Sequence, residues 1–212
     1  MYGFDESTGA PSNKYLPAGI NENVELKEVL FEPLRSDGTG DEVLKFLFSN
    51  AQNEAFTFIE YPMDFDSLVE KAKGWKNTTA EAEAWVKQQF EAQGERIKHI
   101  LSAFIPKDKC VFRANSFKEF ADGVIKMLGT SHHGVLVRIK VVYRREDDKY
   151  TSFPKRAFKP FIQPMSEPNR IKIDPKWDII ENVKPDTSGD AWSASESTNE
   201  SATTETAGKV PW

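Results

Sequence analysis

The chain has 212 residues, of which 39% are hydrophobic, and its formal net charge is −5. This length is enough for one domain with a substantial buried core and extensions. A single cysteine excludes a disulfide framework, no apolar run approaches the roughly 18 residues of a membrane span, and the N-terminus lacks the basic and apolar regions of a signal peptide. We therefore expect a soluble cytosolic protein with no bound metal or other cofactor.

The acidic total conceals a segregation of charge along the sequence. Residues 1–105 carry a net charge of −8, residues 106–176 carry +8, and residues 185–212 carry −4. Charge asymmetry of this kind is typical of a chain in which one part binds a polyanion and another part stays solvated. A charged surface with no ligand is the alternative interpretation, so the positions of the basic residues have to decide between the two.

Three strands are predicted in the first third of the chain. Residues 1–19 are rich in Gly, Pro, Ser and Asn, and we expect them to form a flexible arm. Apolar and polar residues then alternate over 23–31, with an irregularity that predicts a β-bulge, and again over 42–50 and 55–62. Pro62 ends the third of these strands.

A helical insertion is predicted at about residues 64–129. Thr78 with Glu81, and Ser116 with Glu119, form two capping boxes, and each is followed by apolar residues at helical spacing. A proline ends the first of these helices and a glycine ends the second. The aromatic side chains of both helices are expected in the core.

Strands return after the insertion. Residues 135–144 alternate, with one face apolar and with Arg138, Lys140 and Arg144 on the other face. An acidic hairpin turn leads into one or two further strands that are interrupted by prolines. Residues 177–212 are predicted to be a disordered acidic tail, because a segment rich in Ser, Thr, Glu and Ala cannot bury enough apolar surface to fold.

Three strands, a helical segment and two more strands follow the order of an OB-fold, a five-stranded Greek-key barrel that often binds oligonucleotides. We therefore predict an α+β, mainly β fold. It would be a five-stranded OB-fold-like barrel over residues 20–176, with a two-helix insertion between strands 3 and 4 and a disordered C-terminal tail. Other small α+β domains share this order of elements, so the order alone does not define a function.

Basic and aromatic residues are interleaved in the last predicted strands. Successive cations on one face of a strand lie about 7 Å apart, which is comparable to the phosphate spacing of an extended single strand. Cations that follow the phosphates and flat rings that stack on bases are what sequence-tolerant single-strand binding requires. The predicted DNA contacts are Arg138, Lys140, Arg144, Arg145, Lys149, Tyr150, Phe153, Lys155, Arg156, Phe158 and Lys159. For Phe153 and Phe158, a place in the barrel core is an equal alternative.

The sequence ends in Val210, Pro211 and Trp212 after an acidic segment. An apolar aromatic terminus with a free carboxylate has the form of a short docking peptide in which the tryptophan is the anchor. A tail without any such role is the alternative.

Five segments carry a similarity to known proteins: YLPAGINENVELKEVLFEP (15–33), ERIKHILSAFIPKDK (95–109), NSFKEFADGVIKMLG (115–129), VRIKVVYRREDDKYTSFP (137–154) and FIQPM (161–165). Together they resemble a family of phage-encoded single-stranded DNA-binding proteins, of the kind found in large tailed phages of gut bacteria. The resemblance implies a protein that coats single-stranded DNA during phage replication and recombination, in the cytoplasm of the bacterial host. A homo-oligomer is left open.

The C-terminal residues extend the resemblance to possible protein partners. The ending VPW is similar to the Ile-Pro-Phe ending of bacterial single-stranded DNA-binding proteins, which implies docking of phage replication proteins. The chain departs from that pattern in two ways, because Trp212 replaces the phenylalanine and Lys209 stands where an acidic residue is expected.

Two other classes of function compete with DNA binding. Asp64 and Asp66 could hold Mg²⁺ as in a nuclease, but a turn with a helix cap is an equal interpretation. The sequence shows no Gly-rich phosphate loop, zinc-binding helix or nucleophile elbow. A virion or assembly protein that uses its barrel for protein contacts is the main alternative, and it predicts no DNA affinity. We expect a binding protein rather than an enzyme.

Overall fold

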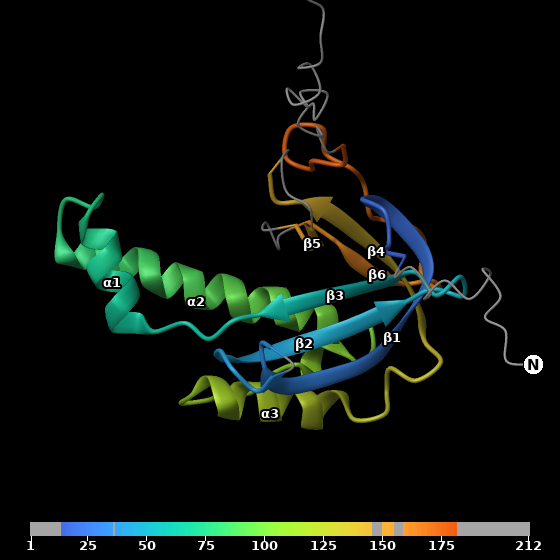
Figure 1. Ribbon diagram of the computed structural model, residues 1–212, viewed down its shortest axis with the longest axis horizontal. Coiled ribbons are helices and arrows are strands. Elements are labelled where there is room, and N and C mark those ends of the chain that lie inside the picture. Colours follow the sequence, from blue (N-terminus) through green and yellow to red (C-terminus); the bar gives the residue numbers. More distant parts are fainter. Residues whose placement is uncertain (1–13, 36, 146–149, 155–158, 182–212) are drawn as a thin grey trace, which may run out of the picture. The chain divides into compact units, whose positions relative to one another are not determined.

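The structure is a computed structural model that describes residues 14–35, 37–145, 150–154 and 159–181. Contacts along the chain separate residues 1–182 from residues 183–212, and the second of these units lies outside the described residues. The first unit has an α+β, mainly β fold. Its described part contains six strands in one open antiparallel sheet and three α-helices (Figure 1).

The strands of the sheet follow the order β3-β2-β1-β4-β5, and β6 pairs with β4. Their bounds are β1 Gly19–Pro33, β2 Glu42–Ser49, β3 Ala55–Glu60, β4 Leu136–Tyr143, β5 Thr151–Ser152 and β6 Ile162–Pro164. The helices are α1 Phe65–Lys73, α2 Thr79–Leu101 and α3 Phe117–Leu128, with a short 3-10 turn at Lys107–Lys109. The first three strands and β4 confirm the sequence prediction.

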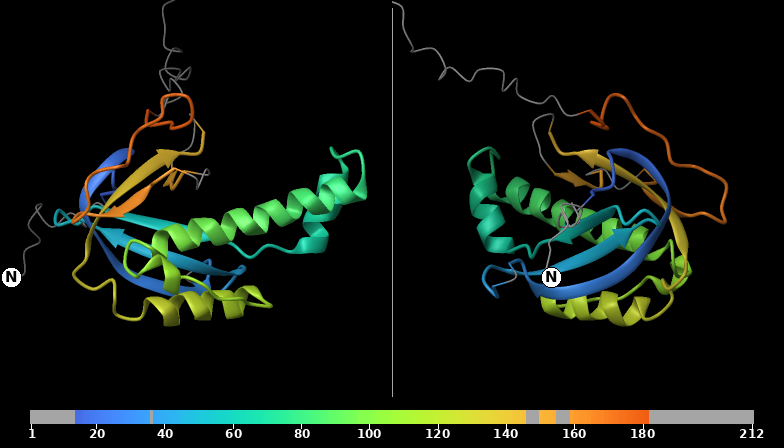
Figure 2. Two further views of the ribbon diagram at one scale, coloured as in Figure 1. Left: turned by 180° about the vertical axis from the view of Figure 1, so that it is seen from behind. Right: turned by 45° about the vertical axis from the view of Figure 1, so that its right-hand side comes forward.

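The predicted two-helix insertion is wrong in one respect, because α1 is a third helix. Asp64 caps it by accepting a hydrogen bond from Ser67 N at 2.7 Å. Only Val69 and Ala72 of this helix are buried, so its apolar pattern is too short to be recognised by periodicity. In Figure 1 and in the rear view of Figure 2, α1 lies at the end of α2 that is farthest from the sheet.

Strand β1 pairs with two neighbours along different parts of its length. Its first part pairs with β4 and its second part pairs with β2. The register shifts between Leu26 and Glu28, as the sequence irregularity predicts, and shifts again between Asn21 and Val24. Asn23 within that second irregularity has a φ of 55°, a conformation that asparagine tolerates better than most residues. The two bulges let one long strand turn from one partner to the other.

The hydrophobic core lies between the inward face of the strands and two of the helices. Alternation along β2 and β3 directs four phenylalanines inward, and none of the four is more than 5% exposed. Helix α3 contacts β1 (Figure 1). The core residues include Phe46, Phe48, Phe56 and Phe58 from the strands, Ile97, Ile100 and Leu101 from α2, and Ala121, Val124 and Leu128 from α3.

Both predicted capping boxes are present. The Thr78 hydroxyl accepts a hydrogen bond from Glu81 N at 3.2 Å, and the Ser116 hydroxyl accepts one from Glu119 N at 3.1 Å. Helix α3 ends at Gly129, whose φ of 48° lies in the left-handed region. No helix in the described part of the chain has both the length and the apolar character that a membrane crossing needs.

The folded part of the chain extends beyond both predicted boundaries. Leu16 belongs to the predicted arm but is 1% exposed, and its backbone N donates to Ala55 O at 3.0 Å. At the other end, Asp178 is buried and Tyr143 N donates to Ile179 O at 2.8 Å. Short segments that are held by backbone and ionic contacts carry no periodic apolar signal, so their composition alone predicted disorder.

Candidate nucleic-acid interface

The predicted row of exposed cations on β4 is wrong at two positions. Lys140 is 1% exposed, and its Nζ lies 2.7 Å from Asp178 Oδ2 and donates to Lys172 O at 3.0 Å. Arg138 is 7% exposed, and its Nε lies 2.7 Å from Glu22 Oε1. Both side chains are therefore committed to contacts within the fold, and neither is available to a phosphate.

The C-terminal end of the described chain explains the burial of Lys140. Strand β6 pairs with β4, and residues 172–178 lie against the Lys140 side chain. Alternation along a strand predicts which residues share a face, but it does not predict which later segment covers that face. The backbone bonds that hold this segment run from Lys140 N to Phe161 O at 2.7 Å, from Met165 N to Leu136 O at 2.9 Å, and from Tyr143 N to Ile179 O at 2.8 Å.

Phe153 belongs to the core, which is the alternative that the sequence left open beside stacking on DNA bases. It is 2% exposed. Four other phenylalanine rings surround it, at centroid distances of 5.7 Å for Phe48, 5.0 Å for Phe56, 5.0 Å for Phe58 and 4.7 Å for Phe161. Edge and tilted contacts at these distances are the preferred aromatic geometry of a packed interior.

The remaining predicted DNA contacts differ in their exposure, and some of them lie outside the described residues. Arg144 and Arg145 are exposed, and Tyr150 is 74% exposed. Lys159 is half-buried and pairs with Asp174. Hydrogen bonds from Lys159 and from the backbone N of Lys176 lower the pKa of the Asp174 carboxyl. Lys149, Lys155, Arg156 and Phe158 lie outside the described residues, and so do Val210, Pro211 and Trp212 of the tail.

A groove of about 630 Å³ lies where residues from β3, β5 and the N-terminal segment meet, and we call it the tyrosine groove. Every tyrosine in the described part of the chain lines it, namely Tyr15, Tyr61, Tyr143 and Tyr150. The remaining lining residues are Leu16, Pro17, Ala55, Phe56, Thr57, Ile59, Arg144, Thr151 and Ser152.

Three of these rings are accessible to a ligand. Tyr15 is 67% exposed and Tyr61 is 40% exposed, and Tyr150 is the most exposed of the three. No carboxylate is among the described residues that line the groove, and its one charged lining residue is Arg144. Flat rings beside a cation, without a competing anion, make a surface that suits unpaired bases and phosphates.

Helix α2 fixes the end of β3 from which Tyr61 extends. Gln93 Nε2 donates to Tyr61 O at 2.8 Å and to Glu60 Oε1 at 3.1 Å. Arg96 makes two bonds to the Glu60 carboxylate, from Nε at 3.0 Å and from Nη2 at 2.8 Å. A bidentate pair of this kind fixes the relative orientation of the two side chains and also strengthens their interaction. The backbone of Tyr61 is thus held against the helix while its ring stays accessible.

The N-terminal segment is held in a similar way beside β3. Ala55 N donates to Lys14 O at 2.8 Å, which complements the bond from Leu16 N to Ala55 O. Tyr15 lies between these two anchors and forms an isolated parallel bridge with Ala55. The buried Leu16 side chain therefore points into the core while the neighbouring Tyr15 ring faces the groove.

Sequence reasoning missed Tyr15 and Tyr61. The first falls within the predicted arm and the second at the end of a predicted strand. A compositional signal was available, since the chain has 15 phenylalanines but only 5 tyrosines. Phenylalanine can fill the core, whereas the tyrosine hydroxyl needs water or a hydrogen-bond partner. The tyrosines were therefore the better candidates for an accessible aromatic surface.

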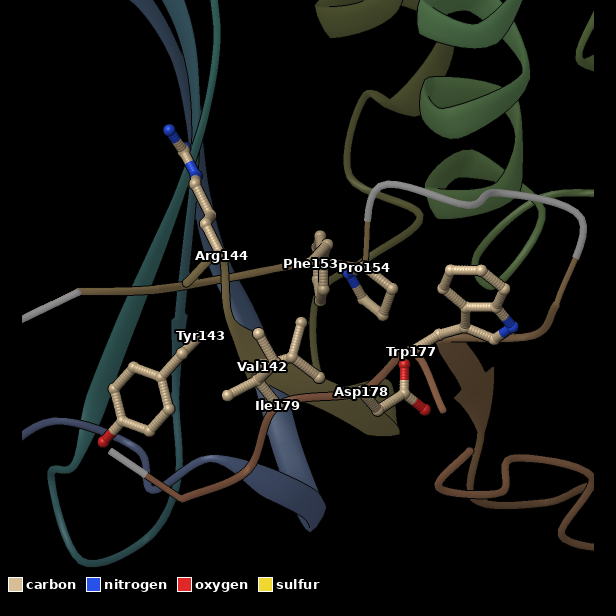
Figure 3. Close-up of a pocket in the computed structure, with 8 residues that line it drawn as sticks. All are labelled: Val142, Tyr143, Arg144, Phe153, Pro154, Trp177, Asp178 and Ile179. Carbon is tan, nitrogen blue, oxygen red and sulfur yellow. The ribbon is translucent and has the colours of Figure 1, made fainter. Parts of the chain in front are cut away.

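A second, smaller cavity of about 170 Å³ adjoins the last residues of β4, and we call it the Trp177 pocket (Figure 3). It shares Tyr143 and Arg144 with the tyrosine groove. The other residues that line it are Val142, Phe153, Pro154, Trp177, Asp178 and Ile179.

The two acidic residues considered as Mg²⁺ ligands both lie at the start of helix α1. Asp64 caps α1, and Asp66 lies in the first turn of that helix, where a negative charge is favourable. Within the described ranges no group of three or more His, Cys, Asp or Glu side chains could hold a metal ion.

Comparisons with known proteins find no match to any family model, any curated protein or any solved structure. The class of ligand is therefore argued from the groove itself, from its rings, its cation and the strands that form it.

Proposed function

We propose that the protein binds single-stranded DNA, with little sequence preference, in the tyrosine groove. The observation that carries this proposal is the gathering of four tyrosines and Arg144 from three separate segments around one groove. The resemblance to phage-encoded single-stranded DNA-binding proteins supports a role for this activity in phage DNA replication and recombination.

The chemistry of such binding divides between rings and cations. Each base that stacks on an aromatic ring contributes about 1–3 kcal/mol, and every base has a face that can stack. Arg144 lines the groove, and Arg145 and Lys14 are exposed at neighbouring positions of the chain. In a duplex the base faces already stack on one another, so rings of this kind favour an unpaired strand.

We also propose that the sheet is an OB-fold barrel that is open between β3 and β5. Three features support this assignment: β1 pairs with both β2 and β4, the helices are inserted between β3 and β4, and β3 contacts β5. In an OB-fold the face of strands 2 and 3 and the loop between strands 4 and 5 bind oligonucleotides. The tyrosine groove combines β3 with residues that flank the β4–β5 connection.

The proposal is tested by fluorescence anisotropy with labelled oligo(dT) and a duplex of the same length, across a salt series that starts at about 50 mM. We expect tighter binding of the single strand than of the duplex. The logarithm of the affinity should fall linearly with the logarithm of the salt concentration. Absence of salt-dependent oligo(dT) binding, or a preference for the duplex, would contradict it.

Protein binding is the second candidate function, and the helices α1 and α2 favour it. Trp75 is 59% exposed and packs edge-on against Trp85 at 5.5 Å. Residues 64–101 carry a net charge of only −1, which suits a protein partner better than a phosphate backbone. An exposed tryptophan on such a surface is a typical interface anchor. A virion or assembly role, and docking of replication proteins on the C-terminal residues, stay within this candidate.

Charge reversal at Arg144 and Arg145 separates the two candidates. Because both side chains are exposed, Arg144→Glu with Arg145→Glu should abolish DNA binding without loss of the fold. Under the second candidate the same variant keeps its assembly with structural proteins, and the wild type shows no DNA affinity. Arg138 and Lys140 are unsuitable for this test because their burial makes any substitution a test of folding.

A further inference from the structure

The Trp177 pocket differs from the tyrosine groove in size. Its volume of about 170 Å³ compares with about 630 Å³ for the groove. The groove has room for a stretch of chain, whereas the pocket has room for one ring system. The two cavities share Tyr143 and Arg144, so a strand that lies in the groove can place its next base in the pocket.

The walls of the pocket are mostly apolar and include three aromatic rings, those of Tyr143, Phe153 and Trp177. Val142 is 5% exposed and Pro154 is buried, while Trp177 is 47% exposed. Figure 3 shows the Pro154 ring beside the Trp177 indole, with Val142 and Ile179 between them and Tyr143. An apolar cavity with an accessible indole favours a flat, uncharged ligand over a solvated chain.

One polar side chain of the pocket is the carboxylate of Asp178. Asp178 is 9% exposed, and its Oδ2 accepts hydrogen bonds from Lys140 Nζ and from Asp174 N, each at 2.7 Å. Among the described residues no hydrogen bond reaches the other oxygen, Oδ1. A carboxylate accepts hydrogen bonds and repels a phosphate. The pocket therefore suits a base edge that donates.

Arg144 completes the arrangement at the boundary between the two cavities. In Figure 3 its side chain points away from Asp178 and Trp177. A phosphate held by Arg144 would thus lie outside the pocket while the attached base enters it. This division places the anionic part of a nucleotide beside the cation and the base beside the carboxylate.

We propose that the Trp177 pocket binds one unpaired nucleobase that carries an exocyclic amino group, such as cytosine or adenine, from a strand held in the tyrosine groove. The inference rests on the proposed function and adds a local base preference to it. Carboxylates accept from the cytosine amino group in established base recognition. Thymine is disfavoured because its two carbonyl oxygens flank its one ring N–H and face the carboxylate.

The test compares labelled oligo(dC) and oligo(dT) of equal length, with the wild type and with Trp177→Ala. We expect the wild type to bind oligo(dC) at least about tenfold more tightly, the lower end of the effect given by one hydrogen bond to a charged group. Trp177→Ala should remove that preference and leave oligo(dT) affinity within about twofold, because Trp177 does not line the groove. Circular dichroism checks the fold of each variant.

A second variant tests the carboxylate without leaving a buried charge. Lys140→Gln with Asp178→Asn keeps a neutral donor and acceptor in place of the ion pair. It should also lose the preference for oligo(dC). Equal binding of both oligomers by the wild type, or a preference that persists in Trp177→Ala, would overturn the base pocket and leave the groove intact. Absence of salt-dependent binding to either oligomer would instead overturn the proposed function.

Discussion

Cations on strand β4 and on the residues that follow it lie in two different environments. Lys140 is covered by residues 172–178 and pairs with Asp178, and Arg138 is buried and pairs with Glu22. Arg144, only a few residues later, is exposed beside the rings of the tyrosine groove. The alternation of the sequence gives all three the same face, so the difference comes from what covers each part of that face.

The two settings have different energetic consequences. A buried charge has lost its hydration and needs its partner, so removal of the partner destabilises the fold. An exposed cation remains hydrated and is available to a phosphate, so its removal changes binding rather than folding. Substitutions near Lys140 should therefore change stability, whereas substitutions in the groove should change DNA affinity.

The largest effect is expected for Asp178→Ala. It leaves Lys140 buried without its ionic partner, and we expect a loss of about 3–5 kcal/mol in the free energy of unfolding, measured by urea denaturation. The matched control, Lys140→Met with Asp178→Leu, removes both charges and should lie much closer to the wild type. A loss below about 1 kcal/mol for the single variant would mean that the pair behaves as a surface salt bridge, contrary to its burial.

Tyr150→Ala should lower DNA affinity rather than stability. The ring is mostly exposed, so stability should change little, while affinity for oligo(dT) falls by about 1–3 kcal/mol through the loss of one stacked base. Tyr150→Phe is the control, since it keeps the ring and should bind like the wild type. If Tyr150→Ala binds normally, or if Tyr150→Phe is equally impaired, stacking on this ring is not the source of affinity.

Arg144→Ala should clearly reduce the salt dependence of DNA binding. The affinity measured at high salt should change less. Loss of one phosphate contact lowers the slope of log affinity against log salt by about 0.7 for a single strand. Lys87→Ala is the control, because Lys87 is exposed on α2 and does not line the groove. Identical slopes for the two variants would remove Arg144 from the interface.

The smallest effect concerns His132, another buried basic group. It is 6% exposed, and burial lowers the pKa of its imidazole. The unfolded chain then binds a proton more readily than the folded one, so stability should fall as pH drops below the ordinary histidine value of about 6.5. His132→Phe, which keeps a ring beside Phe104, should flatten this part of the pH dependence in thermal denaturation. Neither the change of pH nor the His132→Phe substitution should act on oligo(dT) binding through this group. If the pH dependence of stability is the same in His132→Phe as in the wild type, the buried His132 is not its source.

Local patterns predicted much of the fold. Alternation predicted β2, β3 and β4, and the capping boxes at Thr78 and Ser116 predicted where α2 and α3 begin. These features depend on neighbours within a few residues. Helix α1 was missed because it buries little apolar surface, and the folded ends of the domain were missed because backbone and ionic contacts hold them.

The site was less predictable because it is assembled from distant segments. Arg144 and Tyr150 were predicted as contacts from their own neighbourhood in the sequence, and both are exposed and line the groove. Arg138 and Lys140 were misassigned because their cover comes from residues 172–178 and from Glu22. The rings that complete the groove come from the predicted arm and from the end of β3, which no local pattern connects to β4.

Photo-crosslinking tests the central claim most directly. An oligonucleotide that contains 5-iododeoxyuridine is bound to the full chain, irradiated and digested, and the modified residues are identified by mass spectrometry. The account predicts adducts on Tyr15, Tyr61 and Tyr150, which are the exposed rings of the tyrosine groove. Adducts concentrated on Trp75 and Trp85 of the helices, with none in the groove, would contradict it.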